Sequence, residues 1–202
     1  MKTGFVHRLS WAPILAAASL LLAAVGFGLA ADGYSHARHP LALLGARGMD
    51  AAGLFNVLAW ILPGLLLAAQ AAALRECLSG RAGFGARIGA WLLLLSALAF
   101  AGQGVWPLDP HDLEGPDSRR HALGWMLWWI AHLGAGALLV PTLMRQARWR
   151  RAGVGLLLSV LLLLAGVLAA RAGLWPALAG RLAIVAWLGG YLACGIPMRR
   201  GA

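Results

Sequence analysis

Six long apolar stretches divide the chain, and they constrain its fold more than any other feature. An α-helix needs about 20 apolar residues to cross the hydrocarbon core of a bilayer, and each stretch approaches or reaches that length. The stretches do not alternate apolar and polar residues, as the strands of an outer-membrane β-barrel do. The sequence therefore predicts an all-α integral membrane bundle of six helices, with spans at about 11–31, 53–74, 88–106, 122–143, 153–172 and 182–197.

Composition excludes the main alternatives to a membrane bundle. The chain is 61% apolar and 12% charged, whereas a soluble domain is about half apolar and about a quarter charged. Two cysteines are too few for a disulfide scaffold. Because the spans take up nearly the whole chain, we expect a single transmembrane domain over residues 1–202.

The first span has some features of a cleavable signal peptide. Lys2 and Arg8 precede it, and Gly28-Leu29-Ala30 loosely resembles a cleavage site. Its apolar run is nevertheless about 20 residues long, whereas a signal core has 7–15. We therefore expect the span to be retained, with cleavage as the alternative.

The basic residues predict an orientation in the membrane. If the N-terminus is cytoplasmic, the inner segments contain eleven of the seventeen Lys and Arg residues and the outer segments six. Positive charge prefers the cytoplasmic side, so we expect both termini in the cytoplasm and the protein in a bacterial cytoplasmic (inner) membrane. The same inner charge faces anionic lipid headgroups, which accounts for the net charge of +10 without nucleic acid as a partner.

The fourth predicted span places two histidines and two tryptophans on one helix face, namely His121, Trp125, Trp128 and His132. His132 lies about 16 Å along the axis from His121, near the middle of the membrane. An ionisable side chain is costly there, so it should point into the bundle. Three roles for His132 remain open: a hydrogen bond to another helix, a place in a ligand pocket or proton path, and a metal or heme ligand.

The second span repeats polar residues and proline at seven-residue spacing, at Asn56, Pro63 and Gln70. This spacing keeps the three on one face, which we expect to be turned toward the bundle. Pro63 removes a backbone donor and is expected to distort the helix. Small and polar residues recur at the same spacing in other spans, as at Ser96 and Ser159, and predict helix-packing seams.

The second predicted outer loop carries carboxylates and imidazoles, which are natural zinc ligands. Asp109, His111 and His121 could converge on a divalent metal such as zinc, with His36 and His39 of the first outer loop as additional ligands. The alternative is that these side chains belong to a solvated acidic loop.

Two segments carry a resemblance to a known family. The first is His39-Pro-Leu-Ala-Leu-Leu-Gly45 followed by Gly53-Leu-Phe-Asn56, and the second is Gly104-Val-Trp106-Pro107-Leu-Asp109 followed by His121. With six spans, the chain resembles the DUF998 family of prokaryotic membrane proteins, whose function is unknown. The resemblance implies the architecture and the candidate positions Asn56, Asp109 and His121, but no activity.

Two functions remain from these observations. In the first, the protein binds a lipid or small amphiphile in a pocket that faces outward, lined by Asn56, Asp109, His121, Trp125, Trp128 and His132. In the second, it is a metal-dependent hydrolase or transferase acting on a lipid at the outer leaflet, with Asp109, His111 and His121 as ligands. A distant likeness to the seven-span alkaline ceramidase type favours the second, although no histidine follows His132 here. Membrane lipids are the expected partners, and the chain could also form a homo-oligomer or serve as an accessory subunit of a larger complex.

Overall fold

The structure is a computed structural model that describes residues 2–78 and 83–199. Helices make up its regular secondary structure, and no strand occurs in these two ranges. The elements in chain order are α1 (Lys2–Leu9), α2 (Ala12–Ala30), the 3-10 helix η1 (Leu41–Gly45), α3 (Ala52–Asn56), the π-helix η2 (Val57–Ile61), α4 (Leu62–Leu78), α5 (Phe84–Val105), α6 (Pro116–Met144), α7 (Arg150–Arg171) and α8 (Pro176–Arg199).

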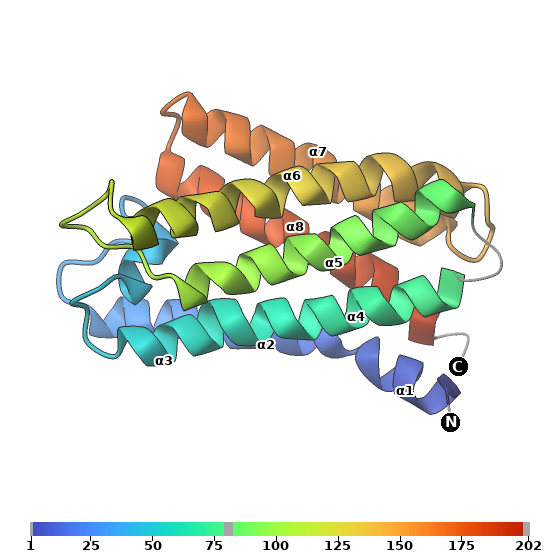
Figure 1. Ribbon diagram of the computed structural model, residues 1–202, viewed down its shortest axis with the longest axis horizontal. Helices are drawn as coiled ribbons and strands as arrows, with labels where there is room; N and C mark the ends of the chain where they lie inside the picture. Colours follow the sequence, from blue (N-terminus) through green and yellow to red (C-terminus); the bar gives the residue numbers. More distant parts are fainter. Residues whose placement is uncertain (1, 79–82, 200–202) are drawn as a thin grey trace.

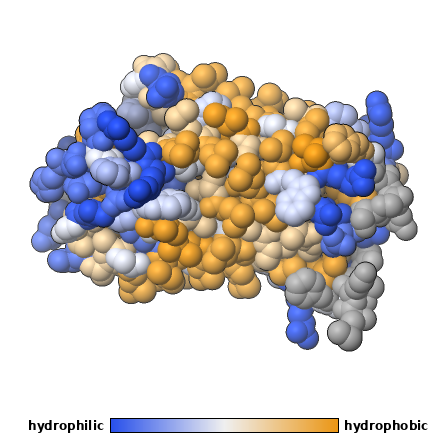
Figure 2. All heavy atoms as spheres, in the orientation of Figure 1, coloured by the Kyte–Doolittle hydropathy of each residue, from blue (hydrophilic) through white to orange (hydrophobic). Residues whose placement is uncertain are grey.

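Six helical segments in the described ranges are long and apolar enough to cross a membrane, which confirms the six predicted spans. They are Val6–Ala30, Ala52–Leu78, Phe84–Val105, Pro116–Met144, Arg150–Arg171 and Pro176–Arg199. On the face shown in Figure 2, a broad apolar belt covers the middle of the molecule and hydrophilic residues gather at its two ends. This distribution is what a bilayer requires of a spanning bundle.

The largest differences from the predicted spans are at the starts of two helices. α6 begins at Pro116 rather than near residue 122, and α8 begins at Pro176 rather than near residue 182. Proline suits the first position of a helix, because its missing N–H has no partner there in any case. Polar residues follow Pro116, and Arg181 interrupts the apolar residues after Pro176, so the apolar run alone starts about one and a half turns too late.

The helices lie side by side along the long axis, with both termini at the same end of the bundle (Figure 1). We call this the terminal end, and the opposite one, where residues 31–51, 106–115 and 172–175 connect the spans, the loop end. From α4 to α8, consecutive helices pack against each other, and α8 also contacts α2 and α4. These contacts close the bundle.

The inner helices of the bundle are α4, α5 and α8. In each of these three helices, 56% of the most apolar 18-residue stretch is buried inside the bundle, compared with 33–39% in α2, α6 and α7. The last helix is therefore part of the core, although its sequence did not distinguish it from the other predicted spans.

The helix irregularity expected at Pro63 takes the form of the π-helical turn η2. In a π-helix, the carbonyl of Leu58 would accept a hydrogen bond from the nitrogen five residues later, which belongs to Pro63 and carries no hydrogen. The Ser19 hydroxyl of α2 donates to this carbonyl instead, at 2.6 Å. A neighbouring helix thus satisfies the backbone group that the proline leaves free.

Asn56 and Gln70 are turned toward the bundle, as predicted, with 6% and 1% of their surface exposed. The Asn56 side-chain amide donates to the Gly45 carbonyl at 2.9 Å, which joins α3 to η1. The Gln70 amide donates to the Tyr191 carbonyl at 2.8 Å, which joins α4 to α8. Both side chains therefore serve helix packing.

Candidate functional site

The helix face predicted from the fourth span points into the bundle. His121, Trp128 and His132 on α6 are buried, and Trp125 is half-buried. The prediction that His132 avoids the lipid is confirmed, since none of its surface is exposed.

Aromatic rings from four helices pack in series through the centre of the bundle. Trp60 contacts Phe100 with 4.9 Å between ring centroids, and Phe100 stacks on Trp187 at 4.3 Å. Trp128 and Tyr191 each pack edge-on against Trp187. Trp128 is thus a core residue rather than part of a cavity wall.

His132 binds another helix. Its Nε2 lies 2.8 Å from the Ser159 hydroxyl of α7, and its ring stacks on Tyr191 of α8. Its Nδ1 has no hydrogen-bond partner in the described part of the chain. Of the three roles left open by the sequence, the structure provides the hydrogen bond to another helix.

Trp187 and Tyr191 of α8 extend this buried network, and neither was among the residues predicted from the sequence. The Trp187 indole donates to the Ser96 hydroxyl at 3.0 Å, and Ser96 donates to the Trp128 carbonyl at 2.8 Å. The Tyr191 hydroxyl donates to the Leu93 carbonyl. The signal in the sequence that could have identified them was a tryptophan and a tyrosine one helical turn apart in the last span.

His121 lies at the loop end of the aromatic series. Its Nδ1 lies 3.1 Å from the carbonyls of both Gln103 and Trp106, at the end of α5. Since a carbonyl can only accept, Nδ1 carries the hydrogen and Nε2 is left as an acceptor.

A cavity of about 180 Å³ opens beside His121, and we call it the loop-end cavity. Its walls come from the chain around η1 and from η2, α6, α7 and α8. Of the six residues that the sequence proposed for a pocket, His121 and Trp125 line it. Its other wall residues are mostly apolar, and they are Pro40, Leu41, Ala42, Trp60, Ala170, Pro176, Ala177, Gly180, Arg181 and Ile184.

Arg181 of α8 is the cation of this cavity, and the sequence analysis did not propose it. Its guanidinium donates to the carbonyls of His39 and Ala177, at 3.0 and 2.9 Å, and to the Tyr34 hydroxyl at 2.6 Å. The His36 Nδ1 lies 3.3 Å away. The sequence could have indicated Arg181, because it is a lone charged residue among apolar residues soon after Pro176, where α8 begins.

The partners of Arg181 show the effect of burial and charge. Burial, and secondly the Arg181 charge, lower the pKa of His36 below its usual value. Burial raises the pKa of the Tyr34 hydroxyl, although Arg181 acts in the opposite direction. Both side chains are therefore neutral near pH 7, and they do not compensate the charge of Arg181.

A second apolar cavity, of about 200 Å³, also has Arg181 in its wall. We call it the α2–α8 groove. It shares Leu41, Arg181 and Ile184 with the loop-end cavity. Its remaining wall residues are Leu20, Leu21, Ala24, Val25, His36 and Val185.

The structure places Asp109 away from both cavities. Its carboxylate lies 3.9 Å from Arg47 and accepts a hydrogen bond from the backbone of His111 at 3.0 Å. Arg47 also pairs with Asp117, so these residues link the two long connections of the loop end. Asn56, bonded to Gly45, lines neither of these two cavities.

The three proposed metal ligands are not brought together. His111 is exposed, Asp109 faces Arg47, and the Nδ1 of His121 is occupied by backbone carbonyls. In residues 2–78 and 83–199, no three His, Cys, Asp or Glu side chains are grouped so that they could hold a metal ion. The geometry gives the metal-dependent hydrolase no support.

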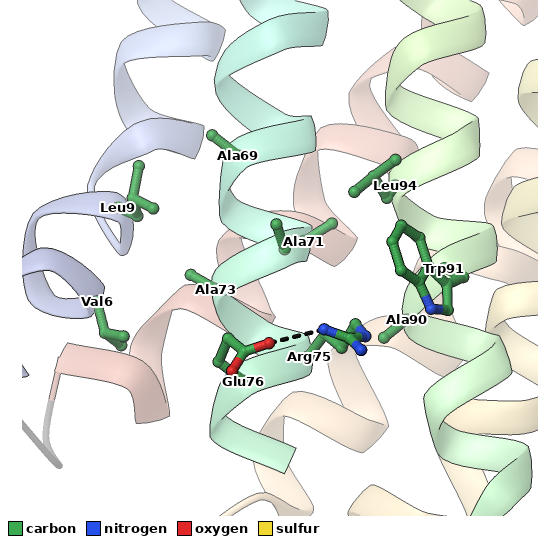
Figure 3. Close-up of a pocket in the computed structure, with 11 residues that line it drawn as sticks. Val6, Leu9, Ala69, Ala71, Ala73, Arg75, Glu76, Ala90, Trp91 and Leu94 are labelled. Atoms are coloured by element: carbon green, nitrogen blue, oxygen red, sulfur yellow. Dashed lines mark hydrogen bonds and ion pairs between the residues drawn. The ribbon is translucent and has the colours of Figure 1, made fainter. Parts of the chain in front are cut away.

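A larger cavity, of about 450 Å³, lies at the terminal end between α1, α4 and α5. Figure 3 shows its residues on both sides of α4, with alanines along the helix and charges at one end. Arg75 pairs with Glu76 at 2.7 Å and lies over the Trp91 ring at 5.0 Å. The cation of this cavity is therefore compensated, unlike Arg181.

Six apolar helices packed around buried aromatic rings define a multi-pass helical membrane protein. The model of the family described as "Protein of unknown function (DUF998)" matches residues 14–196. The chain therefore belongs to the DUF998 family, as its resemblance predicted. No curated protein and no solved structure matched the chain.

Proposed function

We propose that the protein binds a lipid or another small amphiphile in the loop-end cavity. The observation that carries this proposal is the lining of the cavity. Apolar and aromatic walls are joined there by two polar side chains, His121 and Arg181. Small-molecule sites typically combine such walls with a few fixed polar groups.

The two polar groups differ in what they offer a ligand. The free Nε2 of His121 accepts a hydrogen bond, while the guanidinium of Arg181 donates hydrogen bonds and carries a positive charge. Trp125 provides a large apolar surface beside them. An amphiphile would place its polar end against these groups and its apolar part among the walls.

We further propose that the loop end faces outward from a bacterial cytoplasmic membrane. Exposed arginines gather at the terminal end, among them Arg87, Arg145 and Arg151. Positive charge is enriched on the cytoplasmic side of membrane proteins. The cavity then opens toward the outer leaflet.

Native mass spectrometry of protein purified from its membranes tests the binding proposal. Wild-type protein should retain a bound amphiphile, and Trp125→Ala should lower its occupancy by about tenfold, equivalent to ~1.4 kcal/mol of binding free energy. Trp129→Ala is the matched control, because Trp129 is half-buried on the same helix and does not line the cavity.

A second variant tests the cavity by filling it. A Cβ atom built on Gly180 would lie 3.9 Å from the Trp125 ring, so Gly180→Leu should occupy the space meant for the ligand. If wild-type protein retains no amphiphile, or if Trp125→Ala and Trp129→Ala retain equal amounts, the proposal is wrong.

A further inference from the structure

We propose that Arg181 binds the anionic headgroup of a membrane lipid whose acyl chain lies in the α2–α8 groove. This inference rests on the proposed function and specifies the class of amphiphile. Both cavities have Arg181 in their walls, so a lipid anchored there has apolar space beside its headgroup.

The charge of Arg181 is not compensated by a counterion within the described ranges. All four of its hydrogen-bond partners are neutral, namely two carbonyls, a phenol and an imidazole. Within the described ranges, no carboxylate pairs with this guanidinium, whereas Arg47 and Arg120 at the same end each pair with Asp117. A half-buried cation without a counterion favours binding of an anion.

The chemistry of the guanidinium also favours an oxyanion. Its two terminal nitrogens make four contacts with neutral groups, and a phosphate or a carboxylate can replace some of them, because charge-assisted pairs are stronger than hydrogen bonds to neutral acceptors. Both oxyanions occur as lipid headgroups. Arg181 lies five residues after Pro176, about 7.5 Å along the helix from its loop-end start. It therefore lies near the end of the span, where headgroups meet acyl chains.

The α2–α8 groove, which Arg181 lines, offers space for an acyl chain. Its walls are aliphatic apart from His36 and Arg181 themselves. Leu21, Val25 and Val185 are 52–56% exposed, so the groove opens sideways to whatever surrounds the bundle. In a membrane these surroundings are acyl chains, which need not cross a polar barrier to enter.

The experiment compares lipids that differ only in headgroup charge. Purified protein is titrated with an anionic phospholipid and with a zwitterionic phospholipid of the same acyl chains, and the bound species are counted by native mass spectrometry. We expect wild-type protein to prefer the anionic lipid by about tenfold, or ~1.4 kcal/mol. A single-chain fatty acid, added in a separate arm, distinguishes a carboxylate from a phosphate headgroup.

Arginine variants assign that preference to one side chain. Arg181→Gln should abolish it and Arg181→Lys should keep most of it, because lysine retains the charge. Arg38→Gln is the control, since Arg38 is exposed at the same end and lines neither cavity. Tyr34→Phe removes one loop contact of Arg181 without changing the charge, and should leave the preference intact.

Groove variants test the position of the acyl chain. Ala24→Trp fills the α2–α8 groove and should lower binding of the anionic lipid, whereas Leu29→Trp lies on the exposed surface of α2 and should not. Inorganic phosphate alone should not compete at lipid-like concentrations, because it lacks the chain.

The outcomes separate this inference from the proposed function. Retention of a neutral amphiphile that depends on Trp125, with no headgroup preference, overturns the inference and leaves the proposed function standing. A preference that survives Arg181→Gln, or a lipid occupancy unchanged by Ala24→Trp, also overturns it. Absence of any bound lipid refutes both.

Discussion

At the centre of the bundle, one hydrogen bond satisfies the polar ring of His132 within the described part of the chain. Its Nε2 contacts Ser159 of α7, and its Nδ1 has no partner in the described part of the chain. Removing the serine hydroxyl leaves both ring nitrogens unpaired in a dry interior.

We predict that Ser159→Ala lowers the free energy of unfolding by about 1 kcal/mol, the typical scale for a hydrogen bond between membrane helices. His132→Phe removes the group that the serine serves. Adding Ser159→Ala to His132→Phe should therefore cost less than Ser159→Ala costs alone. Unfolding titrations in detergent micelles measure both, and additive effects would contradict the pairing.

At the loop end, the stability of the fold should depend on the protonation of His36. Burial, followed by the Arg181 charge, holds the pKa of His36 below its usual value of about 6.5 in the folded state. Below about pH 6.5 the unfolded chain therefore takes up a proton that the folded chain does not.

Stability contributed by neutral His36 is thus present above pH 6.5 and is lost as the pH falls through the folded pKa. We predict that the difference in thermal midpoint between pH 8 and pH 5.5 is smaller in His36→Gln than in wild-type protein. Parallel pH profiles for the two proteins would show that His36 does not contribute.

Among the elements, the π-helical turn before α4 depends on a neighbouring helix. Pro63 withholds the N–H that the Leu58 carbonyl would use, and Ser19 of α2 supplies the missing donor. In lipid, an unsatisfied backbone carbonyl is costly, so this contact couples the conformation of one span to the packing of another.

We predict that Ser19→Ala lowers the free energy of unfolding by about 1 kcal/mol, and that Ser19→Thr, which keeps the hydroxyl, has a smaller effect. In a Pro63→Ala background the backbone N–H returns, so Ser19→Ala should become nearly neutral there. The four variants form a double-mutant cycle in detergent unfolding. An unchanged cost in the Pro63→Ala background would contradict the proposed exchange of donors.

For the whole molecule, the unequal distribution of charge predicts how the bundle sits in the membrane. In a background with Cys77→Ser and Cys194→Ala, Asp50→Cys at the loop end should react with an impermeant maleimide in intact cells. Arg87→Cys at the terminal end should react only after the membrane is permeabilised. Both side chains are exposed, so access alone separates them. The reverse pattern would place the loop end in the cytoplasm.

Much of the architecture could be predicted because a bilayer imposes a simple rule on the sequence. Each span needs a long apolar run, and polar side chains inside it must face the bundle. This reasoning gave the six helices, the inward face of α6 and the burial of Asn56 and Gln70. The starts of α6 and α8 were missed, because the polar residues after Pro116 and the charge of Arg181 lower the local hydropathy without ending a helix.

The candidate site was less predictable. His121 and Trp125 were found on one helix face, but Trp128 and His132 on that face serve packing, and Asp109 binds Arg47. Which inward side chain meets a cavity depends on the residues opposite it, and these come from helices distant in the chain.

The sequence by itself determined that the chain spans a membrane six times and which helix faces turn inward, since both follow from the local period of apolar residues. Only the tertiary structure decided that α8 lies in the core and that Arg181 lines two apolar cavities. The reason is physical, because the groups that compensate or fail to compensate the charge of an arginine are those that folding brings near it. The partners Tyr34, His36 and His39 lie more than 140 residues from Arg181 in sequence.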